Sequence, residues 1–291
     1  MSLSIWDAAL IAVKAITYAA TLGAAGAVFF LGVCGALVAR EDILRIRRFT
    51  VALAALSVFA GAAQVLVSAG SMRGGAAGMA DGVLVQMVLQ AGPGLAIAVR
   101  ALGLLLAVLG GSSGRPTWWA CLGAATAATS FAWTGHARSL DPDVLPILLV
   151  SVHLVAAAGW LGALAPLLIV ARDGDLPRIG ATAARFGAAA VYAVAALVAA
   201  GAALLWMLLG DFTALWSSAY GRYVMLKLAL VACLLCAAAF NKLRLTPRLL
   251  AGDPDSARSL RASIRLEMVL AGLILAVTAT FTTVAGPPSL G

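Results

Sequence analysis

Long apolar segments alternate with short polar stretches along the whole chain. Each segment is close to or above the roughly 20 residues that a helix needs to cross the hydrocarbon core of a bilayer. The short alternating segments typical of a transmembrane barrel are not present in the sequence. The pattern therefore predicts an all-α fold, a polytopic membrane bundle of eight transmembrane helices. The predicted helices are Ile5–Val38, Phe49–Ala69, Pro93–Gly111, Thr117–Gly135, Leu145–Ala171, Phe186–Leu209, Arg222–Leu243 and Ile264–Ala285.

Composition narrows the class of protein further. Apolar residues make up 63% of the 291 residues and charged residues only 11%, whereas an average soluble domain has about 25% charged residues. A soluble domain of this length would lack the charged side chains needed to cover its surface. The composition excludes a soluble enzyme, a nucleic-acid-binding protein and a disordered chain.

The positive charges are distributed unevenly between the two sides of the predicted bundle. Fourteen of the 20 lysines and arginines fall in the connecting segments 40–48, 112–115, 172–185 and 242–265. Because such loops stay in the cytoplasm, both termini are predicted to lie on the outer side of the membrane. Seven acidic residues, Glu267 among them, share the cytoplasmic side. The net charge of +8 thus reflects topology and not a nucleic-acid partner.

The two halves of the chain show signs of an internal repeat. An Arg-Phe pair opens the second apolar segment of each half, and Arg100 and Lys227 each follow a glycine by six residues. These matches predict a single membrane domain made of two parallel four-helix repeats, about 1–140 and 141–291. The alternative is that helices rich in glycine and alanine simply resemble one another.

Three cations and one histidine lie five or more residues inside predicted spans. In the repeat, Lys14 corresponds to His153, since each precedes a Leu-Gly pair by the same spacing, and Arg100 corresponds to Lys227. All four are expected one to three helical turns below the outer surface. Ionisable side chains are costly inside a bilayer and are therefore functional candidates. Together they predict a polar layer in the outer half of the bundle.

A structural role is the alternative for two of these cations. Arg100 and Lys227 lie near the outer ends of their spans and could extend toward the surface. Their expected partners are then Asp81 or Asp211 in the outer loops, or an anionic lipid head group. Positively charged side chains beside a metal site would repel a metal cation. Their presence in the spans therefore argues against a simple pathway for metal cations through the bundle.

The only two histidines in the sequence are candidate ligands. His153 lies about seven residues into its span, roughly 10 Å along the helix from Pro146. His136 ends the preceding span, and the short loop between them places both in one region. Neutral imidazole is a common ligand of copper, zinc and haem iron. Alternatively, His153 is a core residue bonded to a backbone carbonyl and His136 a solvated loop residue.

Soft sulfur ligands accompany the histidines. Five of the seven methionines, Met207 and Met225 among them, map to the outer side. Thioether sulfur favours Cu(I) and survives an oxidising compartment. Cys233 and Cys236 lie on one face of a predicted helix and could pass a soft ion inward, although both could equally be packing residues. No disulfide framework is predicted.

Motifs for other chemistries are missing from the sequence. It has no glycine-rich phosphate loop, Walker-type motif or aspartyl-phosphate segment, so ATP-driven pumping by this chain is not expected. No constellation with the spacing of hydrolytic catalysis is present, and the protein is not expected to be an enzyme.

Several stretches resemble one known family. The stretch 152–164, VHLVAAAGWLGAL, contains His153, and Gly135-His136-Ala137 precedes it. The stretch 219–230, AYGRYVMLKLAL, contains Lys227 and is followed by Phe-Asn-Lys-Leu at 240–243. These residues are similar to motifs of the CopD family of copper-resistance inner-membrane proteins. The resemblance is strongest over about 130–250.

The resemblance has functional implications. It implies copper import across the bacterial inner membrane, with the termini periplasmic and a separate periplasmic CopC-like copper-binding protein as partner. It assigns copper contacts to His136 and His153 and leaves the ion as Cu(I) or Cu(II). The stretch Ala91–Gly94 departs from the family pattern, since it lacks the expected threonine and aromatic residues before the glycine.

Two other functions use the same ligands. A single-haem membrane redox protein would bind its iron through His136 and His153 as axial ligands. An assembly factor would hold copper without net transport. The first alternative predicts a haem absorption band, and the second predicts no copper flux into sealed vesicles.

Overall fold

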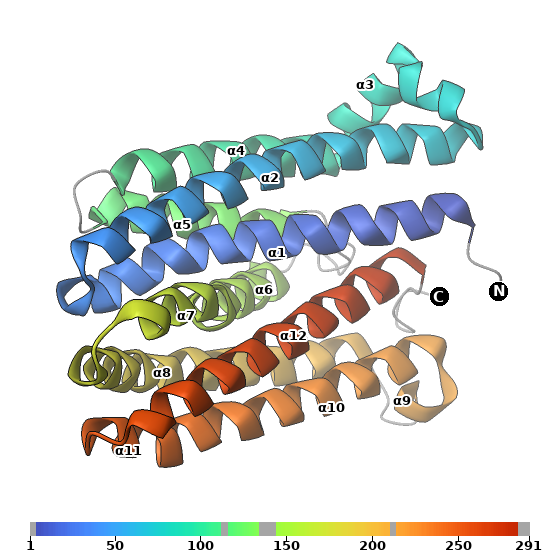
Figure 1. Cartoon of the computed structure of the whole chain (residues 1–291). Helices are drawn as coiled ribbons and strands as arrows, with labels where there is room; N and C mark the ends of the chain where they lie inside the picture. The colour runs from blue at the N-terminus through green and yellow to red at the C-terminus, as the bar shows by residue number, and fades with distance from the viewer. Residues whose placement is uncertain (1–3, 112–115, 134–143, 210–213, 285–291) are drawn as a thin grey trace.

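The fold is a bundle of long helices that run along one common direction (Figure 1). The computed structural model describes residues 4–111, 116–133, 144–209 and 214–284. Within these ranges the chain contains no β-strand. The predicted all-α bundle is therefore confirmed.

Helices form wherever the apolar segments were predicted, with several breaks. The first half contains α1 (Ile5–Cys34), the 3₁₀ turn η1 (Gly35–Leu37), α2 (Arg40–Arg73), η2 (Ala76–Ala80), α3 (Gly82–Gln90), α4 (Gly92–Gly110), α5 (Trp118–Thr129) and η3 (Ser130–Trp133). The second half contains α6 (Val144–Ala157), the π-helical turn η5 (Ala158–Gly162), α7 (Leu164–Asp173), α8 (Leu176–Leu209), α9 (Ala214–Ser217), α10 (Ala219–Phe240), the π-helical turn η6 (Asn241–Leu245), α11 (Thr246–Leu250) and α12 (Pro254–Val284).

Seven helices in the described part of the chain are long and apolar enough to cross a membrane. The predicted span over Thr117–Gly135 corresponds to α5, which has 12 residues, and to the 3₁₀ turn η3 that follows it. This segment is too short to qualify on length alone, so an eighth span stays a prediction. Two of the seven spans, α6–α7 and α10–α11, are continuous paths through a π-helical turn.

The two ends of the bundle differ in charge. The α1–α2 and α7–α8 connections and the segment η6–α11 gather at one end, on the left of Figure 1. We call it the basic end, because three of the four arginine- and lysine-rich segments lie there. The start of α1, α3, α9 and the end of α12 lie at the opposite end. Residues 40–48, expected as a loop, instead form the first turns of α2.

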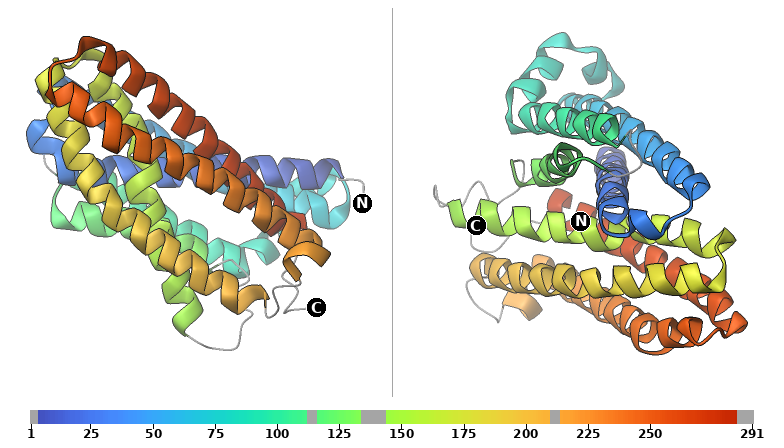
Figure 2. Two further views of the ribbon diagram at one scale, coloured as in Figure 1. Left: turned by 90° about the horizontal axis from the view of Figure 1, so that it is seen from below. Right: turned by 90° about the vertical axis from the view of Figure 1, so that its left-hand side faces the viewer.

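Helix α1 lies inside the bundle. Seen from the basic end, α1 and α6 lie between the α2–α4 side and the α8–α10 side (Figure 2). Its closest crossing is with η5, where backbone meets backbone. A side-chain carbon added at Gly26 would lie 2.3 Å from the Ala158 carbonyl oxygen, and one at Gly162 would lie 2.0 Å from the Leu22 carbonyl oxygen. Glycine at these positions allows the close approach, as small residues do between helices in membranes.

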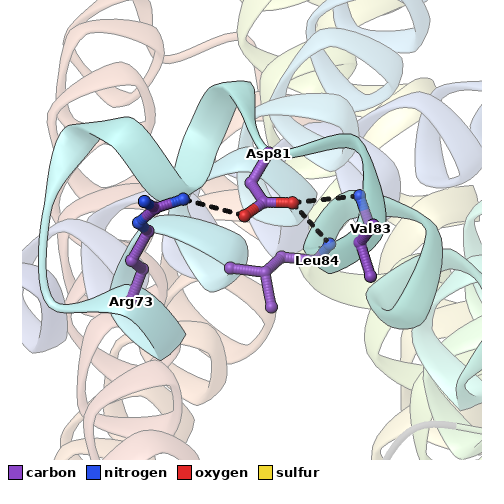
Figure 3. Close-up of polar contacts among 4 residues, drawn as sticks. All are labelled: Arg73, Asp81, Val83 and Leu84. Atoms are coloured by element: carbon purple, nitrogen blue, oxygen red, sulfur yellow. Dashed lines mark hydrogen bonds and ion pairs between the residues drawn. The ribbon is translucent and has the colours of Figure 1, made fainter.

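Asp81 organises the segment between α2 and α4. Its Oδ1 accepts hydrogen bonds from the backbone N–H groups of Val83 (3.1 Å) and Leu84 (3.4 Å), which caps α3 (Figure 3). Its Oδ2 accepts a hydrogen bond from Arg73 Nη1 at 2.9 Å. Asp81, one of the alternative partners expected for Arg100 and Lys227, instead pairs with Arg73 of its own segment.

The Asp81 contacts predict a graded response to substitution. Asp81→Ala removes the cap and should destabilise α3 by about 1 kcal/mol. Asp81→Asn keeps a capping oxygen and weakens only the exposed ion pair, which is worth about 0–1 kcal/mol. Hydrogen exchange of the α3 amides measures the difference. Equal protection in both variants would contradict the capping role.

Candidate functional site

His153 has a fixed orientation on α6. Its Nδ1 lies 3.1 Å from the backbone carbonyl oxygen of Leu197 on α8. Because a carbonyl oxygen can only accept, Nδ1 carries the hydrogen and the neutral imidazole has its lone pair on Nε2. Histidines that bind metals are commonly oriented in this way, with the second ring nitrogen donating to a backbone carbonyl. The ring is half-buried.

Two further residues define the surroundings of the imidazole. A side-chain carbon at Gly201, one turn after Leu197, would lie 3.2 Å from His153 Cε1 and 3.3 Å from Nδ1. Glycine thus leaves room for the ring against α8. The positive charge of Lys227 on α10 also acts on His153. Lys227 and His153 are both residues predicted for the polar layer.

Lys14 connects the first and last helices. Its Nζ donates hydrogen bonds to the Thr282 carbonyl oxygen at 3.2 Å and to Thr283 Oγ1 at 3.0 Å, both on α12. The ammonium group is therefore satisfied by neutral oxygens near the end opposite the basic one. Lys227 lies near the same turns of α12, because its Nζ is 5.7 Å from the centre of the Phe281 ring.

Arg100 is the most deeply buried of the predicted cations, with 4% of its surface exposed. Its Nε donates to Ser130 Oγ at 3.0 Å, and its guanidinium lies 4.0 Å above the Phe131 ring. Tyr18 packs edge-on against the same ring, with the centroids 4.8 Å apart. Nη1 is buried without a hydrogen-bond partner among the described residues. Arg100 therefore belongs to an aromatic cluster of the first half of the chain.

The structure places the predicted sulfur ligands on α8 and α10. Met207 lies ten residues after Leu197 on α8, which is roughly 15 Å along the helix. Met225 lies on α10, two residues before Lys227. Cys233 and Cys236 are exposed on the outside of the bundle as free thiols.

The remaining predicted ligand, His136, lies outside the described residues. In the part of the chain that the structure describes, no group of three His, Cys, Asp or Glu side chains could hold a metal ion. His153 is therefore the only predicted ligand for which the described structure provides an oriented donor atom.

Sequence reasoning missed the burial of Glu267. Glu267 was counted among the charges of the cytoplasmic side, but it lies within α12 with only 2% of its surface exposed. Its Oε1 accepts a hydrogen bond from Asn241 Nδ2. The available signal was a lone glutamate followed at once by the long apolar run of residues 268–279.

These features define a class of protein before any comparison is made. Long apolar helices with buried cations are those of a multi-pass membrane protein, in which buried ionisable side chains mark candidate functional positions. Residues 5–141 match the family model described as "Copper resistance protein D-like, N-terminal domain". Residues 180–281 match the model described as "Copper resistance protein D". The chain belongs to the copper resistance protein D family.

One curated relative is also similar. "Copper transport protein CutJ" of Bacillus subtilis (strain 168) is 27% identical over 161 residues, which cover 54% of this chain and 28% of the relative. The match thus spans little more than a quarter of that protein's length. No solved structure matches the chain significantly. The family is thus described by copper resistance and the relative by copper transport.

Proposed function

We propose that the protein imports copper ions across the bacterial inner membrane and that His153 Nε2 is their principal contact. The observation that supports the proposal is the hydrogen bond from His153 Nδ1 to the Leu197 carbonyl. It fixes the tautomer that leaves the Nε2 lone pair available to a metal ion. The family-model matches end at residue 141 and resume at residue 180, so the assignment of His153 rests on its own geometry.

The ligand set that we propose includes residues beyond His153. His136, Met207 and Met225 would deliver copper from the end opposite the basic one, which we assign to the periplasm. Cys233 and Cys236 would offer soft sulfur farther along α10. A separate CopC-like protein would supply the copper, and both termini would lie on its side of the membrane.

The cations of the polar layer constrain how the site selects its ion. Lys14, Arg100 and Lys227 make the outer half of the bundle positive, which disfavours hard cations held by charge alone. Imidazole and thioether ligands bind copper through their donor lone pairs. The two repeats of the sequence would then differ in role, with Arg100 in an aromatic cluster and Lys227 beside His153.

The test of the proposed function is copper flux in sealed proteoliposomes. Vesicles that contain the protein should accumulate copper well above protein-free vesicles. Copper bound in proportion to the protein, with none in the vesicle lumen, would contradict transport and support an assembly factor. A Soret band in the purified protein would instead support the haem alternative.

Gly201 provides a test that leaves His153 in place. Gly201→Ala would put a methyl group 3.2 Å from the imidazole and should displace the ring, with a loss of copper affinity of about tenfold, as for other lost orienting contacts. Gly272→Ala is the matched control, because a methyl group there meets open space on α12. Competition with a colorimetric Cu(I) chelator measures both. Equal affinities in the two variants would show that the ring is not held as described.

A further inference from the structure

A buried carboxyl group lies in the half of the bundle toward the basic end. Glu267 is 13 residues into α12, which places it roughly 20 Å along the helix from Pro254. Its side chain contacts Asn241, the first residue of the π-helical turn η6. Among the described residues it forms no ion pair.

A carboxylate in this position is poorly compensated. A buried charge normally needs an oppositely charged partner, because transfer of an ion out of water costs several kcal/mol even after relaxation. The single amide N–H of Asn241 is a neutral donor. Glu267 therefore needs a positive charge from outside the protein, and a proton is the smallest cation that can supply it.

Asn241 is suited to serve both forms of the carboxyl group. Its Nδ2 donates to Glu267, while its Oδ1 is buried without a partner among the described residues. Rotation of the amide would present Oδ1 to a protonated carboxyl group, which can donate. The Asn241 side chain is not needed by its own backbone. The backbone carbonyl oxygen of Asn241 already accepts hydrogen bonds from the N–H and the hydroxyl of Thr246.

Charged groups elsewhere do not serve Glu267. Helix α12 packs against α1, α7, α8, α10, α11 and η6, and their charged side chains in the described part of the chain are exposed or bonded to other groups. On η6, Lys242 donates to the Gly187 carbonyl oxygen and Arg244 is exposed. On α8, Arg178 pairs with Asp175 and Arg185 donates to the Val33 carbonyl oxygen. Each remaining charged side chain is exposed or has another contact. On the packed helices these are Asp7 and Lys14 (α1), Arg172 (α7), Arg222 and Lys227 (α10) and Arg248 (α11), and on α12 itself they are Asp255, Arg258, Arg261 and Arg265.

The carboxyl group shares its two helices with the outer polar layer. Lys227 on α10 contacts Phe281 on α12, and Asn241 lies 14 residues farther along α10. Glu267 lies 14 residues before Phe281, so the two contacts are in register along antiparallel helices. Fourteen residues correspond to about 21 Å. Glu267 therefore lies about 21 Å closer to the basic end than the Lys227–Phe281 contact does.

We propose that Glu267 and Asn241 form a proton-binding site that exchanges one proton for each copper ion transported. The proposal rests on the proposed function. In the resting protein the carboxyl group holds a proton from water. An arriving copper ion makes the protonated carboxyl group unfavourable, so the group releases its proton to water on the outer side, and it takes up a proton from water on the inner side after copper is released there. At the carboxyl group only the O–H bond is broken and re-formed. The bonds that copper forms with its ligands on arrival are broken on release, and no electron is transferred.

The first measurement tests the proton alone. Infrared spectra of the detergent-purified protein at neutral pH should show the carbonyl absorption of a protonated carboxyl group. Glu267→Gln should remove that band, and Asp255→Asn, which alters an exposed carboxylate on the same helix, should leave it unchanged. Identical spectra of the wild type and Glu267→Gln would overturn the proposal whether or not the protein transports copper.

The second measurement tests the coupling. Proteoliposomes that enclose a pH-sensitive dye should become more alkaline inside as copper enters. Glu267→Gln should lose this pH change, while Glu267→Asp, which keeps the carboxyl group, should retain it in part. Copper entry into wild-type vesicles without a pH change, or the same change with Glu267→Gln, would overturn the coupling. Absence of copper entry in the wild type would instead contradict the proposed function.

Discussion

Replacing His153 with alanine is expected to abolish copper accumulation by cells that make the protein and to leave its abundance in the membrane unchanged. The imidazole is the one predicted ligand whose donor atom is oriented by the described structure, through the hydrogen bond to the Leu197 carbonyl. Loss of a supporting contact alone costs about 10–100-fold in metal affinity, so loss of the ligand itself should reduce copper uptake to the background of cells without the protein.

The folding cost of His153→Ala should be small, because the imidazole is half-buried and contributes one hydrogen bond to neighbouring α8. Ser151→Ala is the matched control, since this hydroxyl lies on the same helix and donates only to the Ile147 carbonyl oxygen. Elemental analysis of washed cells, normalised to the amount of protein, gives the result. Equal copper contents in cells with the wild type and with His153→Ala would contradict the assignment of His153 as the principal copper contact.

A large effect on folding is expected from Gly162→Ala. The added methyl carbon would lie 2.0 Å from the Leu22 carbonyl oxygen, and this neighbour is the backbone of α1, which cannot move aside as a flexible side chain can. Overpacking of this kind costs about 1–3 kcal/mol or more. Because α1 and η5 cross at the centre of the bundle, the two halves should separate slightly and the protein should unfold at a lower temperature.

Gly159→Ala, three residues earlier in the same π-helical turn, is the control. A methyl group there meets its nearest neighbour, Phe29 Cδ2, at 4.0 Å, so the substitution should leave the melting temperature close to that of the wild type. Thermal unfolding in detergent, followed by circular dichroism, compares the two. A similar melting temperature for both variants would show that the α1–η5 crossing is looser than described.

The helical fold was readable from the sequence because a bilayer imposes one length on every span. The positions at which α-helices are interrupted within spans could not be predicted from the sequence. The span predicted over Leu145–Ala171 is divided by η5, and the turn is set by the approach of Gly26 and Gly162 from helices far apart in the sequence. Likewise, nothing in the sequence pattern shows that α5 is shorter than its apolar segment.

The site was predictable in part, for a similar reason. His153 and Arg100 stand out because ionisable residues are rare in apolar segments. The orientation of Cys233 and Cys236 toward the outside could not be inferred, because α10 is apolar on all faces and its pattern does not show which face packs inward. Glu267 was misplaced because the arginines just before it resemble the basic loop, while its burial depends on Asn241 of a different helix.

X-ray absorption at the copper edge tests the central claim most directly. Purified wild-type protein loaded with one equivalent of Cu(I) should show the scattering of coordinated imidazole, and His153→Ala loaded in the same way should show less of it, because only the imidazole of His136 is left to contribute. The same imidazole signal in both samples, or none in the wild type, would contradict the account in which His153 Nε2 holds the transported ion.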